Sequence, residues 1–241
     1  MSNTTVVSRR DMKEPDKFQS TAGRAAGWVA AHKKQVYGAL VALAVAVVAV
    51  IVGSQVQASR EEKAGVALFD VGTTMSGQVS SVPLPGQTGP RFADETARQT
   101  AIAAGAEKVR ADHPGSSAGT TAALIAGDAQ LRLGAWEKAR AAYDAYLSGA
   151  DRSDPLKFSA LEGVALAEEG AGKLDAAAQA FERMAKEAPE VGAIGVLGRA
   201  RVLAKAGKVD EARKLLSGFA DAHKGSELAG DAAERLSKLG K

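Results

Sequence analysis

The sequence GAWEKARAAYDAYL, residues 134–147, introduces a spacing that the chain uses three times. It carries a glycine, a large residue, an alanine and an aromatic at steps of two, three and four: Gly134, Trp136, Ala139 and Tyr143. The same steps recur in GKLDAAAQAFERM (172–184) and GKVDEARKLLSGF (207–219). A glycine with positive φ can end one helix, and an alanine lets the next helix pack closely on it. We therefore expect three helical hairpins that bury their apolar faces by stacking in a row.

Two similar segments flank the repeats. ADHPGSSAG and DAHKGSELAG share His, one further residue and Gly-Ser, so Ser116 and Ser226 are equivalent points 110 residues apart. That interval has room for three repeats. We expect residues 91–111 to form a helix of a degenerate leading repeat. Residues 226–239 are expected to form the polar capping helix that a solenoid needs at its end.

These units resemble the tetratricopeptide repeat, whose pattern is a small residue early in the first helix, then Gly, large, Ala and aromatic, and a closing Pro. The positions that match are Gly127, Gly134, Trp136, Ala139 and Tyr143; Gly172, Leu174, Ala177, Phe181 and Pro189; Ala200, Gly207, Val209, Ala212 and Leu216. Two departures are a spacing other than about 34 residues and a bulky Tyr146 where a small residue is usual. The first helix of the second copy can be aligned on Gly163 or Ala165. The resemblance implies an all-α, tetratricopeptide-like solenoid of about three repeats with flanking helices.

An uncharged apolar run, VYGALVALAVAVVAVIVG, occupies residues 36–53. Eighteen helical residues rise about 27 Å, close to the roughly 30 Å hydrocarbon core of a bilayer. We therefore expect an N-terminal transmembrane helix over residues 35–54. A cleaved signal peptide that ends at Ala58 is the alternative, but the run is longer than such a segment usually is.

The positive charge of the chain is concentrated before the apolar run. The net charge is +3, yet residues 1–34 hold seven Lys/Arg against three acids, which leaves 24 basic and 25 acidic residues afterwards. A folded domain without clustered positive charge argues against nucleic-acid binding. By the positive-inside rule, the N-terminus stays in the cytoplasm and the C-terminal part is exported.

The region after the apolar run changes composition twice. QASREEKAGVALFDV reads as a helical extension, and the next 21 residues are rich in Gly, Ser, Thr and Pro, as in a flexible linker. We thus expect five segments: a basic cytoplasmic tail (1–34), the transmembrane helix (35–54), a helical extension (55–71), a flexible linker (72–92) and the repeat domain (93–241).

The sequence offers little for catalysis. GSSAG (115–119) matches the G-x-S-x-G pattern of a nucleophile elbow, with His113 just before it. That elbow requires a strand in front of the serine, whereas a helix end precedes this one, so Ser116 or Ser117 is better placed as a helix N-cap. The chain has no cysteine and no motif for a metal, phosphate or dinucleotide. We expect no enzyme activity, no cofactor and no metal site.

The resemblance implies that the first helix of each repeat lines a concave groove for protein partners. The positions carried over to the first and third repeats are Thr121, Leu124, Asp128, Leu131, Arg132, Ile194, Leu197, Arg201 and Lys205. In the second repeat, Glu162 and Glu169 are candidates. For each residue, an ordinary solvated surface is the alternative interpretation.

The layout as a whole resembles the ancillary subunit of the bacterial Sec translocon. That resemblance implies a single-pass inner-membrane protein with a periplasmic repeat domain, which acts as a non-catalytic adaptor. The partners it implies are the translocon and periplasmic chaperones. Two alternatives stay open: a scaffold for envelope assembly or cell division, and an envelope serine hydrolase centred on Ser117.

Overall fold

The computed structural model describes residues 17–80, 89–151, 153–188 and 191–239. The chain divides into two compact units, Met1–Ala58 and Ser59–Lys241. Its elements follow in this order: α1 (Lys17–Ala31), α2 (Lys33–Met75), β1 (Gln78–Val79), β2 (Arg91–Phe92), α3 (Glu95–Asp112), α4 (Ser117–Arg132), α5 (Trp136–Gly149), α6 (Lys157–Gly170), α7 (Leu174–Glu187), α8 (Gly192–Lys205), α9 (Val209–Ala222) and α10 (Glu227–Lys238). The expected closing proline, Pro189, lies outside the described residues.

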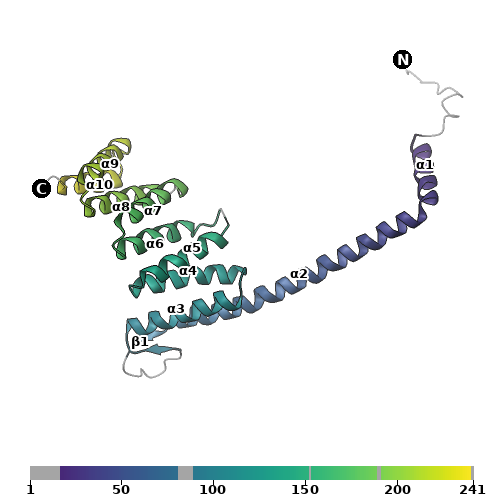
Figure 1. Ribbon diagram of the computed structural model, residues 1–241, viewed down its shortest axis with the longest axis horizontal. Coiled ribbons are helices and arrows are strands. Elements are labelled where there is room, and N and C mark those ends of the chain that lie inside the picture. The colour runs from purple at the N-terminus through teal and green to yellow at the C-terminus, as the bar shows by residue number, and fades with distance from the viewer. Residues whose placement is uncertain (1–16, 81–88, 152, 189–190, 240–241) are drawn as a thin grey trace, which may run out of the picture. The chain divides into compact units, whose positions relative to one another are not determined.

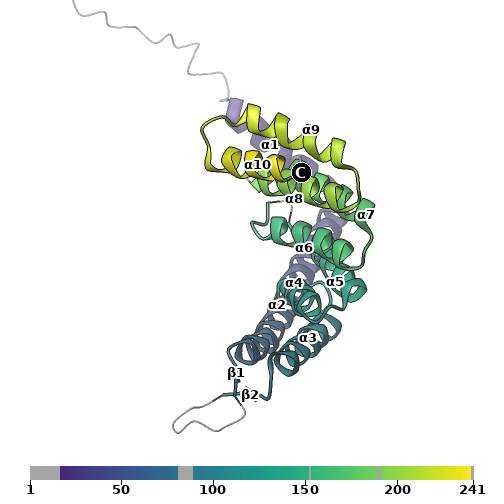
Figure 2. The ribbon, with the colours of Figure 1, turned by 90° about the vertical axis from the view of Figure 1, so that its left-hand side faces the viewer.

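In the second unit, the helices stack in the order of the sequence. Each helix from α4 to α9 packs on the one before it and the one after it, while α10 packs on α9 (Figures 1 and 2). The buried clusters follow one another along this stack, from α3 and α4 at one end to α8, α9 and α10 at the other. Helix α4 also contacts α6, the corresponding helix of the next repeat. Contacts confined to the same and adjacent repeats are the mark of a helical solenoid.

The repeated spacing has the structural role expected of it. Gly134, Gly172 and Gly207 adopt φ values of 70°, 76° and 79°, and each separates the two helices of a hairpin. The alanine of each copy is completely buried: Ala139, Ala177 and Ala212. The large residue four positions later has at most 2% of its surface exposed: Tyr143, Phe181 and Leu216. The hairpin prediction is confirmed in all three copies.

Aromatic rings connect each repeat to the next through glycine. Tyr143 of α5 packs on Gly163 of α6, and Phe181 of α7 packs on Gly198 of α8, so closely that a Cβ on either glycine would clash with the ring. Gly163 and Gly198 stand 35 residues apart, as Gly172 and Gly207 do. This register aligns Ala165 with Ala200 and settles the alignment of the second repeat.

The start of the repeat unit differs from the expected layout. Helix α2 continues to Met75, and its residues Ala64 and Val71 are buried. Val71 belongs to the same apolar cluster as Ile102 and Val109 of α3. The end of α2 and α3 therefore form a leading helical pair, and the compact unit begins near residue 59 and not at residue 93.

The expected linker is only partly described, because residues 81–88 lie outside the described residues. On either side of that gap, β1 and β2 pair as a parallel two-residue ladder, with Gln78 opposite Arg91. Gly77 is buried next to it, where a Cβ would come within 2.6 Å of the Phe92 ring. The two ends of this segment are thus held together, which the all-α expectation did not include.

In the first unit, α2 contains the apolar run. It is long and apolar enough to cross a membrane by length and composition, and none of its most apolar 18-residue window is buried. Among the described residues it is the one helix that meets these criteria. A signal sequence would satisfy them as well, so the span itself is taken up below as a proposal.

Candidate partner-binding groove

A groove of about 250 Å³ opens where α6, α7, α8 and α10 meet. Its lining residues are Glu162, Phe181, Ile194, Leu197, Gly198, Arg201, Leu228, Asp231 and Arg235. Leu197 and Phe181 are buried, whereas Ile194 and Leu228 keep 42% and 41% of their surface exposed. The groove therefore presents two exposed aliphatic side chains among groups of both charges.

Helix α8 brings three of the predicted residues together. Ile194, Leu197 and Arg201 follow one another at steps of three and four, and residues at these steps share one face of a helix. Glu162 of α6 lines the same groove. The register of the repeats explains this, because Glu162 stands 35 residues before Leu197.

The predicted residues of the first repeat lie outside this groove, and two of them serve the fold. Leu124 is buried in the cluster formed by α4, α5 and α6. Asp128 accepts a hydrogen bond of 2.7 Å from the hydroxyl of Tyr143. Burial and this hydrogen bond raise the pKa of Tyr143. Both residues therefore hold α5 in place.

The three others of that repeat are at the surface. Thr121 and Leu131 are half-buried, and Arg132 is exposed. The hydroxyl of Thr121 donates to the carbonyl of Ser117 within its own helix. Leu131 packs against the same apolar cluster as Leu124, so Arg132 is the exposed position of the three.

Arg201 and Lys205 are already engaged by an acidic residue of the preceding repeat. Glu169, whose side chain is 10% exposed, lies 2.6 Å from Arg201 and 3.4 Å from Lys205. The Arg201 guanidinium also lies 5.8 Å from the centre of the Phe181 ring. Only the Glu169 side chain is nearly buried, so loss of both cations would leave its charge without a partner. These two cations therefore link α6 to α8, a role that the sequence alone did not indicate.

The sequence analysis missed the contribution of α10. It read this helix as a polar cap, yet Leu228, Asp231 and Arg235 line the groove. Two of the three guanidinium nitrogens of Arg235, Nε and Nη2, donate to the Asp231 carboxylate at 2.9 Å each, which fixes the pair at the edge of the groove. The equivalence of the two flanking segments could have revealed the role of α10 in the groove. An offset of 110 residues relates Asp231 to Thr121, which was already a candidate groove residue.

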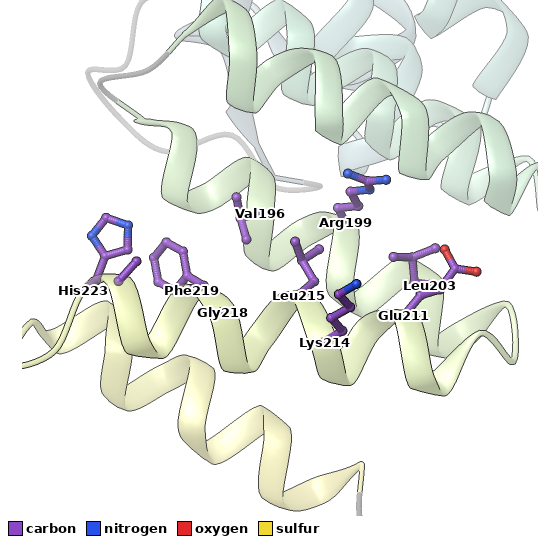
Figure 3. Close-up of a pocket in the computed structure, with 10 residues that line it drawn as sticks. Val196, Arg199, Leu203, Glu211, Lys214, Leu215, Gly218, Phe219 and His223 are labelled. Atoms are coloured by element: carbon purple, nitrogen blue, oxygen red, sulfur yellow. The ribbon is translucent and has the colours of Figure 1, made fainter.

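A second and larger concavity, of about 580 Å³, lies between α8 and α9. Its apolar floor includes Val196, Leu215 and Phe219, and Figure 3 shows His223 and Glu211 at its opposite ends. The His223 ring packs against Phe219 at 4.4 Å between ring centres.

Small residues create this second concavity. Its wall contains Gly218 and Ala222, and 35 residues earlier α7 has Arg183 and Glu187 instead. Those two side chains pair at 2.7 Å, and Glu187 also lies 3.1 Å from Lys157 of α6. The equivalent space in the second repeat is thus filled by an ion-pair network.

The GSSAG segment starts a helix, as the N-cap interpretation predicted. The Ser116 hydroxyl accepts a hydrogen bond from the Gly119 amide at 2.9 Å. The amide of Ser117 donates to the Glu61 carboxylate at 3.1 Å, so α2 also helps to cap α4. A helix, α3, precedes the segment, which is not the strand that a nucleophile elbow requires. Within the described ranges, no group of three or more His, Cys, Asp or Glu is placed to hold a metal ion.

Comparison with known proteins adds one match. Residues 169–236 match the sequence model of a family described as tetratricopeptide repeat. None of the curated proteins compared with the chain matches it. The matched segment contains α7 to α9 and most of α10, and hence every residue of the groove except Glu162. The match supports a tetratricopeptide-repeat protein and, with it, a role in protein–protein interaction.

Proposed function

We propose that this chain is a non-catalytic, membrane-anchored adaptor that binds a protein partner through the groove between α6, α8 and α10. The observation that carries the proposal is the exposed aliphatic pair Ile194 and Leu228 within a tetratricopeptide-repeat segment. Exposed aliphatic groups flanked by charges suit an apolar segment of a partner, whose polar flanks would meet Glu162 and Arg235.

The proposed location is the bacterial inner membrane. Residues 35–54 would cross it once, with the N-terminus in the cytoplasm and the repeat unit in the periplasm. The uncharged run in α2 and the excess of basic residues before it support this orientation. Such a layout suits work in protein export or with periplasmic chaperones, and the translocon is the partner we propose to look for first.

The groove can be tested with a photoreactive amino acid in the full-length protein in cells. We expect crosslinks to the same partner from position 194 and from position 228, since both side chains are exposed in the groove. The matched control is Leu156, which is 46% exposed but precedes α6 and lies outside the groove. Equal crosslinking from all three positions, or none from the groove, would refute the proposal.

Aliphatic-to-charge changes give the complementary test. These variants carry no photoreactive amino acid, and the partner identified by crosslinking is measured by co-purification with each of them. Ile194→Glu combined with Leu228→Glu is expected to lower the amount of co-purified partner more than tenfold, while Leu156→Glu leaves it unchanged. Reversing Arg201 or Lys205 would be less informative, because it would also break the pairs with Glu169. Circular dichroism of each variant checks that the fold is kept.

A further inference from the structure

The large side chains of α1 gather on one side of the helix. At about 100° per residue, Arg24, Trp28 and Val29 of α1, together with His32 directly after its end, fall within an arc of roughly 140°. Within residues 23–31, the opposite side of α1 carries only small residues: Gly23, Ala26, Gly27 and Ala30. This helix therefore has one side that can make contacts and one bare side.

Trp28 is held in place on the contact side. Its ring stacks on the His32 imidazole at 4.7 Å between centres and 22° between planes, and 57% of its surface is exposed. His32 Nδ1 lies 2.9 Å from the Trp28 carbonyl oxygen. An exposed indole beside cationic residues is typical of side chains at a membrane–water interface.

Glu14 and Asp16 precede α1, but every charged residue from Lys17 to Arg60 is basic. Residues 17–60 contain five Lys/Arg and no Asp or Glu: Lys17, Arg24, Lys33, Lys34 and Arg60. Four of these precede the apolar run, and only His32 separates α1 from α2. Basic residues next to a membrane span are attracted to the anionic lipids of the cytoplasmic leaflet.

We infer that α1 lies on the cytoplasmic surface of the membrane, with its Arg24–Trp28 side against anionic phospholipid headgroups. The inference rests on the proposed span in α2, which places α1 next to the lipid surface. A helix that packed on another protein helix would use its bare side, since small residues allow close approach. The large cationic and aromatic groups instead match an interface of anionic headgroups and acyl chains.

The chain contains no cysteine, so one introduced cysteine reports a single position. We place a fluorophore on Ala25→Cys, beside Trp28 on the contact side, and on Ala30→Cys, on the bare side. The full-length protein is reconstituted in phosphatidylcholine vesicles with or without phosphatidylglycerol, and a brominated phospholipid serves as the quencher. Both substitutions start from an exposed alanine, so the two positions form a matched pair.

We expect strong quenching at Ala25→Cys, weak quenching at Ala30→Cys, and a difference that depends on phosphatidylglycerol and decreases with salt. Arg24→Gln should lower the partitioning of α1 about fivefold, whereas Arg24→Lys should retain it. Equal quenching at the two positions, no quenching at either, or quenching independent of phosphatidylglycerol would each overturn the inference.

Extraction of the membranes at alkaline pH separates this inference from the proposal it rests on. If the protein is released, the span in α2 is refuted, and the surface position of α1 fails with it. If the protein stays in the membrane while the Ala25→Cys label is not quenched, only the position of α1 is refuted.

Discussion

Replacing Phe181 by alanine tests the contact that links the second repeat to the third. The Phe181 ring is 1% exposed, and a Cβ built on Gly198 would lie 2.5 Å from its Cε1 atom. Deleting a buried aromatic ring costs about 3–5 kcal/mol of unfolding free energy. Loss of the Arg201 guanidinium from the ring face adds about 0.5–1 kcal/mol.

The same contact predicts a reversal of sign at Gly198. In the wild type, Gly198→Ala forces a methyl group against the ring, and such overpacking costs about 1–3 kcal/mol. In the Phe181→Ala background, the methyl enters the space that the ring has left. Alanine then contributes its helix propensity, about 1 kcal/mol relative to glycine. Gly198→Ala should therefore destabilise the wild type and stabilise the variant.

The measurement is urea unfolding of the fragment Ser59–Lys241, followed by circular dichroism. Gly218→Ala in α9 is the control, because a Cβ there would meet no atom within 4 Å. That control should add about 1 kcal/mol in both backgrounds. Gly198→Ala with the same effect in both backgrounds, or a Phe181→Ala cost within about 0.5 kcal/mol, would refute the close packing of Phe181 on Gly198.

Two further predictions concern the start of the repeat unit and its response to alkali. The fragment 59–241 should unfold cooperatively. The fragment 93–241 should be less stable and should bind a hydrophobic dye, because it exposes the face of α3 that packs on Val71. Equal denaturation midpoints for the two fragments would contradict this. Tyr143 has its pKa raised above the ordinary value of 10.0 by burial and by Asp128, so it contributes stability below about pH 10 that is lost as the pH rises further. Tyr143→Phe should thus be less stable at neutral pH, by about 1–3 kcal/mol, and lose less on going to alkaline pH; parallel pH profiles of unfolding free energy would show that the hydroxyl is not coupled to folding.

The sequence was sufficient to predict the three helical hairpins because the residues that determine them lie close together in the chain. A positive-φ glycine, a buried alanine and a large residue lie within ten positions of one another, as at Gly134 and Tyr143. Helix periodicity and turn chemistry act at this range, so the pattern could be read directly. The N-caps at Ser116 and Ser226 were predictable for the same reason.

The contacts between repeats were not predictable in this way. Glu169 and Arg201 are 32 residues apart, and their pairing depends on how α6 and α8 are placed beside each other. The leading helical pair was missed because the α2 segment carries no glycine–alanine–aromatic pattern and follows an apolar run that suggested a separate anchor. The lining of the groove by α10 was hidden by the charged residues of this helix, which suggested a purely polar cap.

The alternation of aromatic ring and glycine also determines how the protein could become longer. Phe181 faces Gly198, and the block from Gly172 to Ala206 contains both. A tandem duplication of these 35 residues would supply a second ring and a second glycine in the same register, so the new junction would be complementary without further substitution. It would also duplicate Ile194 and Leu197, so an added repeat would extend the proposed groove together with the scaffold.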